Sequence, residues 1–228
     1  MHFSPPLFKG YLLKRYKRFF VDIELEDGRH VTAHCPNTGS MLGVIEEGRV
    51  VGLSHHDDPK RTLAYTLQMI EDDGVMVGVN THNPNKIVFE ALKNNYFDRL
   101  QGYENIHKEV KVSTHSRLDF ALTSPHQPTC YIEVKNVHYK KGETAYFPDS
   151  KTERGQKHIS ELSALVHQGN RCVMLYIVQR PDVKKFAFAD FIDPAYASLA
   201  NDAKSKGVEM YAYTCDVSFD RISLKNIL

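Results

Sequence analysis

Three ionisable side chains near the middle of the chain have types and spacing that suit metal-assisted phosphoryl chemistry. Asp119 lies in one short apolar segment, and Glu133 and Lys135 lie in the next. Because side chains alternate across a strand, Glu133 and Lys135 share the polar face of their segment, and Asp119 takes the polar face of its own. The connecting loop is nearly symmetric about His126, so a hairpin folded there places Asp119 opposite Glu133.

Two carboxylates that face each other on a sheet repel, so this arrangement needs a stabilising partner. A hard divalent cation supplies one, because magnesium binds one or two carboxylates together with water and phosphate oxygens. Such a metal polarises a phosphoryl group and lowers the pKa of a bound water, and Lys135 would orient that water or balance the charge on phosphorus. The pattern therefore indicates phosphodiester hydrolysis. The alternative is a solvated sheet face on which Lys135 relieves the repulsion.

The elements expected to position these side chains change in character near residue 82. Before it, short extended segments are separated by turns such as Asp73-Gly74, and no convincing helix interrupts them. The predicted strands are 11–25, 29–35, 49–56, 63–71 and 75–81. Five short antiparallel strands predict that residues 1–82 form an N-terminal five-stranded β-barrel of the oligonucleotide-binding (OB) type.

After residue 82, helical and extended patterns alternate. Asn83 is placed to cap a helix with Pro84 at its first position, and apolar residues follow at helical spacing. Two further helices are predicted at 152–168 and 193–207, and strands at 118–122, 129–137, 172–179 and 208–217. The alternation predicts a mixed-sheet α/β domain over residues 83–228, so the whole chain is of the α+β or α/β class.

The composition limits the partners and the compartment. The 228-residue chain has a net charge of +1 from 29 basic and 28 acidic residues, so nucleic-acid binding must depend on local clusters. The cysteines, at 35, 130, 172 and 215, lack the spacing of a zinc or disulfide framework. No apolar run is long enough to cross a bilayer and no secretory signal is evident, so we expect a cytoplasmic protein without membrane contact. The oligomeric state is not fixed by the sequence, which is compatible with a homodimer.

A basic and aromatic segment near the start of the barrel is the predicted nucleic-acid surface. Lysine and arginine neutralise phosphates, and exposed aromatic rings stack on bases. No acidic residue precedes Asp22. The predicted contacts are Lys14, Arg15, Lys17, Arg18 and Phe19. The alternative is a solvated edge strand whose aromatic rings belong to the core.

Longer motifs run through both halves of the chain. They are THACPNTGSM at 32–41, SRLDF at 116–120, EVKNV at 133–137, AYFPD at 145–149, TERGQKH at 152–158 and VQR at 178–180. Together, from about Leu13 to Ser218, they resemble the sugar fermentation stimulation protein family. The resemblance implies an N-terminal OB barrel and a C-terminal domain similar to PD-(D/E)xK nucleases, in a DNA-binding protein with a role in regulating sugar metabolism.

The resemblance also implies roles for the central residues. Asp119 corresponds to the nuclease aspartate, and Glu133, Val134 and Lys135 correspond to the (D/E)xK element. Leu118 stands where the usual proline would precede the aspartate. Asp119, Glu133 and the Val134 carbonyl would hold Mg²⁺ or Mn²⁺, and Lys135 would assist the attacking water.

Further site residues are predicted on two helices. Glu90 lies on the first helix of the second domain, where related nucleases carry an acidic residue; the alternative is an ordinary exposed position. Gln156 and Lys157 open the helix after the hairpin, beside Arg154. A helix N-terminus with such side chains suits a catalytic or phosphate-binding role, and the alternative is simple capping and solvation.

The sequence is compatible with three functions. The first is a DNA-binding protein whose C-terminal domain has a Mg²⁺-dependent nuclease site. The second is a non-catalytic DNA-binding regulator of sugar (maltose) metabolism genes. The third is a metal-dependent hydrolase of a small phosphate or nucleotide, against which only the basic and aromatic segment argues. DNA is the expected partner, with single strands and RNA as open alternatives.

Overall fold

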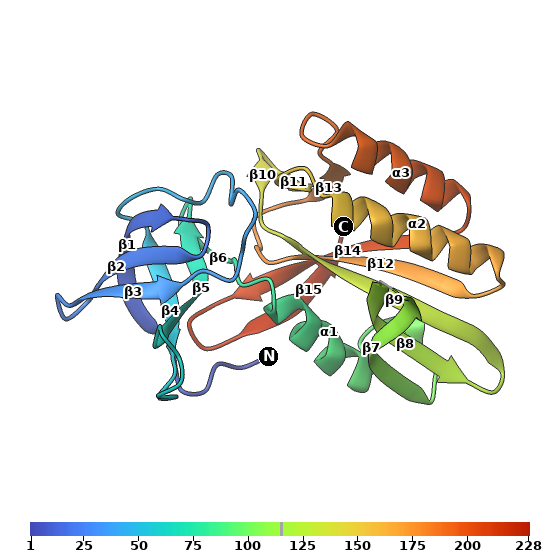
Figure 1. Cartoon of the computed structure of the whole chain (residues 1–228), viewed down its shortest axis with the longest axis horizontal. Coiled ribbons are helices and arrows are strands. Elements are labelled where there is room, and N and C mark those ends of the chain that lie inside the picture. The colour runs from blue at the N-terminus through green and yellow to red at the C-terminus, as the bar shows by residue number, and fades with distance from the viewer. Residues whose placement is uncertain (115) are drawn as a thin grey trace.

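The chain folds into a closed β-barrel beside a layered α/β unit (Figure 1). The structure is a computed structural model, and it describes residues 1–114 and 116–228. No helix within these ranges is long and apolar enough to span a membrane.

The first unit is a closed barrel of five strands with a sixth strand at its edge. Its strands are β1 (Phe8–Tyr16), β2 (Phe20–Leu25), β3 (His30–His34), β4 (Val50–His55), β5 (Tyr65–Asp72) and β6 (Val75–Gly78). β2 pairs with β1 and β3, β4 pairs with β1 and β5, and a parallel contact between β3 and β5 closes the ring. Alternate side chains such as Val21 and Ile23 fill the buried apolar core. The barrel is OB-like, as predicted.

The strand predicted at 11–25 consists of two strands joined by a tight turn. Lys17 and Arg18 have positive φ values of 47° and 65°, and Tyr16 pairs with Phe20 across the turn. No glycine, proline or asparagine marks this turn, so the prediction of one long strand is wrong. The strand predicted at 75–81 is β6, which pairs with β5 outside the closed ring.

The second unit is a six-stranded mixed sheet with helices on both faces. Its main elements are α1 (Asn83–Lys93), β7 (Asn105–Ser113), β8 (Ser116–Ser124), β9 (Gln127–Val137), α2 (Glu153–His167), β12 (Arg171–Val178), α3 (Pro194–Ser205), β14 (Glu209–Val217) and β15 (Ile222–Ile227). The strand order is β15-β14-β12-β9-β8-β7, with β12 parallel to β9 and β14. α1 covers one face, and α2 and α3 cover the other (Figure 1).

Shorter elements complete this unit. They are the 3₁₀ helix η1 (Asp98–Leu100) and a small sheet of β10 (Lys140–Lys141), β11 (Thr144–Phe147) and β13 (Lys185–Phe188). The mixed sheet with helices predicted after residue 82 is confirmed, but β7 and β15 were not predicted. Both are edge strands of the main sheet and carry many exposed polar side chains, so they lack the apolar alternation that reveals an inner strand.

Side-chain caps begin two of the helices. The Thr152 hydroxyl accepts a hydrogen bond from the Gly155 amide at 3.0 Å, and Asp193 accepts one from the Tyr196 amide at 2.9 Å. Such caps satisfy amides that have no partner within the helix. At α1 the expected cap differs, because the N-cap residue is His82 and Asn83 lies within the first turn.

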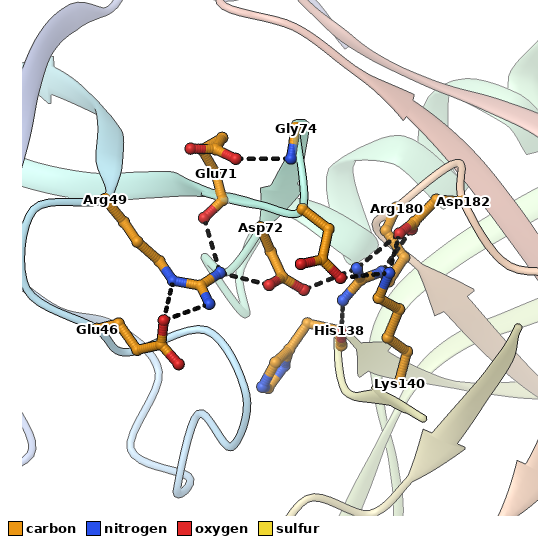
Figure 2. Close-up of polar contacts among 10 residues, drawn as sticks. Glu46, Arg49, Glu71, Asp72, Gly74, His138, Lys140, Arg180 and Asp182 are labelled. Carbon is orange, nitrogen blue, oxygen red and sulfur yellow. Dashed lines mark hydrogen bonds and ion pairs between the residues drawn. The ribbon is translucent and has the colours of Figure 1, made fainter. Parts of the chain in front are cut away.

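A buried network of charges joins the barrel to the second unit (Figure 2). Arg180, after β12, is almost fully buried and pairs with Asp72 of β5 at 2.8 Å and with Asp182 at 2.7 Å. Arg49 pairs with the other oxygen of Asp72, and Lys140 pairs with Asp182 at 2.5 Å. Because each of these charges has a partner of opposite sign, the network is compatible with burial and fixes the two units against each other.

His138, beside this network, is expected to make stability depend on pH. Burial lowers its pKa; Asp149 and Asp72 oppose this effect, and Arg180 and Arg15 add to it. The folded protein therefore favours the neutral ring, so this contribution to stability is present above the ordinary pKa of 6.5 and is lost as the pH falls through the folded-state pKa. We expect the free energy of unfolding to fall between about pH 7 and pH 5, and to fall less in His138→Gln. Urea unfolding at several pH values measures this free energy for the wild type and for His138→Gln. An identical pH dependence in the two proteins would contradict the role of His138.

Candidate metal and nucleic-acid site

Asp119 lies where the hairpin of β8 and β9 opens. The last pair at this end is Phe120 with Ile132, in the predicted register; beyond it β9 continues beside β12 and β8 continues beside β7. The Oδ2 atom of Asp119 accepts a hydrogen bond from the Val134 amide at 2.7 Å. The aspartate thus bridges the opening between the strands, within electrostatic reach of Glu133.

Glu133 is buried, and its two carboxylate oxygens have different surroundings. Oε1 accepts a hydrogen bond from Lys135 Nζ at 2.6 Å and contacts Nδ1 of His158. Lys135 Nζ also lies 3.2 Å from that ring nitrogen. Oε2 is buried and has no hydrogen-bond partner in the described part of the chain. A buried carboxylate oxygen without a partner is costly, so this atom is the strongest candidate for binding a ligand.

The two carboxyl groups have pKa shifts of opposite sign. Burial and then the negative charge of Glu133 raise the pKa of Asp119 to about 6, although two hydrogen bonds and the charge of Lys135 act against the rise. Burial also acts to raise the pKa of Glu133, but Lys135 and His158 outweigh it, and the pKa is lowered. A cation placed between the two groups would stabilise both as anions.

Two side chains at this site were not predicted. Asn85, in the first turn of α1, donates its amide to Oδ1 of Asp119 at 2.6 Å. His158, on α2, is buried and holds Oε1 of Glu133. His158 falls inside the motif at 152–158, which was an available signal. Neither the type nor the spacing of Asn85 distinguishes it from other polar residues at the start of a helix.

The structure does not bring Glu90 and Gln156 to this cluster. The Glu90 carboxylate pairs with the amine of Met1 at 2.5 Å. With 3.6 residues per turn, Glu90 and Asn85 lie on different sides of α1, so the residue that reaches the aspartate is Asn85. Gln156 donates its side-chain amide to Asp193, the cap of α3, at 3.0 Å. Both predicted catalytic side chains therefore have structural partners elsewhere.

Both arginines of the predicted barrel surface bind the chain itself. Arg15 donates to the carbonyl oxygens of Asn37 and Gly39, each at 2.9 Å, and Arg18 donates to the Thr38 carbonyl at 2.8 Å. They fix the loop that follows β3, which leaves less of each guanidinium for a phosphate. The other predicted contacts of this hairpin are exposed: Lys14, Lys17 and Phe19.

The predicted basic residues of α2 lie on its outer surface. Arg154 and Lys157 are exposed, and Lys157 lies 3.9 Å from Glu161. The neighbouring His158 is buried. The same helix therefore presents basic side chains to solvent in the turns from which His158 reaches Glu133.

The donor set fits a hard divalent cation held by two carboxylates. Among the described residues, no group of three or more His, Cys, Asp or Glu side chains could hold a metal. Magnesium, however, uses one or two carboxylates when water and phosphate oxygens complete its coordination, and manganese favours the same oxygen ligands. The unpartnered Oε2 of Glu133 and the raised pKa of Asp119 are the two features that such a cation would relieve.

The protein is of the class that joins an OB-like barrel to a mixed-sheet α/β unit. Residues 13–79 match the family model described as the SfsA N-terminal OB domain, and residues 82–221 match the Sugar fermentation stimulation protein RE domain. The chain belongs to the sugar fermentation stimulation protein family.

Relatives match nearly the whole chain. The sugar fermentation stimulation protein homolog of Geobacter sulfurreducens is 48% identical and covers 96% of this chain and 94% of that protein. The homolog of Caulobacter vibrioides is 46% identical, with coverage of 96% and 92%. The structure of Pyrococcus furiosus SfsA in complex with Ca²⁺ is similar at a TM-score of 0.90 and 29% identity, covering 100% of this chain and 96% of that one. The barrel and the α/β unit are therefore arranged as in that relative.

Proposed function

We propose that the protein is a metal-dependent nuclease that binds DNA and hydrolyses its phosphodiester bonds. Asp119 and Glu133 would hold Mg²⁺ or Mn²⁺, with the Val134 carbonyl as a further ligand. The observation that carries the proposal is the buried, unpartnered Oε2 atom of Glu133. The alternative of a solvated sheet face does not account for it, because Glu133 is only 3% exposed and water does not cover this carboxylate.

The side chains of this chain would bind, orient and neutralise charge. A bound metal would polarise the phosphoryl group and lower the pKa of a water molecule. Lys135, held at Glu133, would place its ammonium where negative charge develops on the phosphoryl oxygens. The hydrogen bond from Asn85 orients Asp119, and the contact with His158 orients Glu133. Each ligand thus has a partner that fixes its direction, as outer residues of metal sites do.

The choice of metal, substrate and compartment draws support from several sources. A family member from Pyrococcus furiosus has been solved in complex with Ca²⁺. OB barrels bind oligonucleotides, which favours DNA over a small phosphate as substrate. The four cysteines are free and buried, as expected in the reducing cytoplasm, where we place the protein.

The test is incubation of the purified protein with labelled single-stranded and double-stranded DNA and RNA, in Mg²⁺, Mn²⁺, Ca²⁺ or EDTA. Cleavage in Mg²⁺ or Mn²⁺ that stops in EDTA supports the proposal. DNA binding without cleavage in any metal would instead favour a regulator of sugar (maltose) metabolism genes. Cleavage of nucleotides but not of polymers would favour the small-phosphate hydrolase.

His158→Ala is expected to weaken Mn²⁺ binding by about 10–100-fold, because Glu133 would lose the partner that fixes Oε1. Isothermal titration calorimetry measures the affinity. His158→Asn retains a side-chain donor and should recover part of it. His167→Ala, an exposed histidine at the end of the same helix, is the matched control and should bind Mn²⁺ normally. A folded His158→Ala protein with unchanged affinity would exclude this role.

A further inference from the structure

A cleft between the barrel and α1 continues toward Asp119. The larger part, of about 500 Å³, lies against the loop after β4 and the start of α1, and its lining includes His55, His56, Gln68, Asn83 and Lys86. The smaller part, of about 200 Å³, is lined by residues that include Asn85, Lys86, Phe89, Lys108 and Asp119. Lys86 lines both parts, so its side chain lies at the junction between the barrel cleft and the candidate metal site.

Gln68, on β5, holds the two walls of the larger cleft together. Its Nε2 donates to the Ser54 hydroxyl at 2.8 Å, and its Oε1 accepts from the amides of Asn80 and Asn83 at 2.9 and 3.0 Å. The Ser54 hydroxyl lies 3.1 Å from Nε2 of His56. One chain of hydrogen bonds therefore links the barrel strands to the first turn of α1 along this cleft.

Two cations, Arg61 and Lys86, lie near His56 of this cleft. Burial first and then the charges of Arg61, His55 and Lys86 lower the pKa of His56, so its ring favours the neutral form. Arg61 is exposed in the loop after β4 and donates a hydrogen bond to the Thr66 hydroxyl at 3.0 Å. Lys86 is exposed and forms no ion pair within the described residues. An anion placed beside Arg61 and Lys86 would be attracted by both cations, and the neutral ring of His56 offers it a hydrogen-bond donor.

The larger part of the cleft has two acidic residues, Asp57 and Asp58, in the loop after β4, and the smaller part has Glu109 and Asp119. Asp57 pairs with His55 at 3.2 Å, and the Asp58 carboxylate accepts a hydrogen bond from the Lys60 amide at 2.9 Å. The partners of Asp57 and Asp58 thus lie in the same loop or at the end of β4. Lys86 is on α1 and also lines the smaller part of the cleft at Asp119. In the smaller part Lys86 and Lys108 lie beside Glu109 and Asp119, and Lys86 is the lysine that also lines the larger part.

We infer that Lys86, together with His56 and Arg61, binds backbone phosphates of a nucleic-acid strand next to the phosphodiester held at Asp119. The inference rests on the proposed function and assigns the path of its substrate. The strand crosses the start of α1 and runs onto the β4–β5 loop of the barrel. It does not depend on the β1–β2 hairpin, whose arginines bind the loop after β3.

The test measures binding of a labelled single-stranded DNA oligonucleotide to the full-length protein in EDTA, by fluorescence anisotropy at several salt concentrations. Lys86→Ala should weaken binding several-fold. The slope of log affinity against log salt should become shallower by about 0.7, the value for one phosphate contact on a single strand. Arg61→Ala should act in the same direction. Lys93→Ala is the matched control, because Lys93 is an exposed lysine at the end of the same helix.

The outcomes separate this inference from the proposed function. If Lys86→Ala matches Lys93→Ala in affinity and slope, the strand path is wrong, whatever the cleavage assay shows. If binding depends on Lys86 but the wild type cleaves nothing in Mg²⁺ or Mn²⁺, the strand path stands and the nuclease proposal fails. If the wild type binds no DNA or RNA oligonucleotide, both fail.

Discussion

Asp119→Asn should lower the rate of Mg²⁺-dependent DNA cleavage by about 10³-fold. Asparagine keeps the shape of the side chain but removes the negative charge that a cation needs at the opening between β8 and β9. The loss of several kcal/mol of charge stabilisation corresponds to a rate effect of this size. Single-turnover cleavage of a labelled DNA with the protein in excess measures the rate without a contribution from product release.

The same substitution should leave the protein folded, with little change in stability. In the absence of metal it removes a buried carboxyl group that Glu133 repels, but the asparagine NH2 group cannot accept one of the two hydrogen bonds from Asn85 and Val134, so the two effects oppose each other and the melting temperature should change little. Asp216→Asn is the matched control, because Asp216 is exposed on β14 and pairs with Lys225. If Asp119→Asn cleaves DNA as fast as Asp216→Asn does, the metal site has been placed wrongly.

The hairpin register next to Asp119 and Glu133 could be predicted because it depends on local properties. Strand alternation and a loop symmetric about His126 are enough to set the register of a hairpin, and the pair Phe120–Ile132 has that register. The opening of the hairpin beyond this pair could not be predicted. It depends on each strand's other neighbour, β7 or β12, and β7 is an edge strand with little apolar alternation.

The choice between two polar residues on α1 needed the tertiary structure. The sequence shows which face of the helix is apolar, through residues such as Ile87 and Val88. It does not show which of the remaining side chains comes nearest the sheet's acidic residue. Packing places Asn85 there and leaves Glu90 beside the start of the chain.

The basic segment of the barrel shows a different limit of prediction from the sequence. A run of cations and aromatic rings predicts an exposed surface when the segment is one straight strand. The turn at Lys17 and Arg18 lacks every usual turn residue, and it directs Arg15 and Arg18 onto the following loop. Composition alone could not distinguish cations that bind a partner from cations that bind their own backbone.

Arg180→Ala should lower the free energy of unfolding by about 3–5 kcal/mol, the usual cost of removing one partner from a buried ion pair. The guanidinium is almost fully buried and joins Asp72 of the barrel to Asp182 and to the carbonyl of His138 in the second unit (Figure 2). Its removal leaves Asp72 with Arg49 alone, and no other charge in Figure 2 bridges to Asp72 from the second unit. Urea unfolding gives the free energy.

Calorimetry should distinguish a lost link between the units from a general loss of stability. If Arg180 joins the units, the variant should unfold in two separate transitions or in a broader one than the wild type. Arg180→Met retains side-chain volume without charge and should be destabilised to a similar degree. Lys184→Ala is the control, because Lys184 and Glu143 form an exposed ion pair whose loss should cost no more than about 1 kcal/mol. If Arg180→Ala behaves like Lys184→Ala, the buried network does not hold the barrel to the α/β unit.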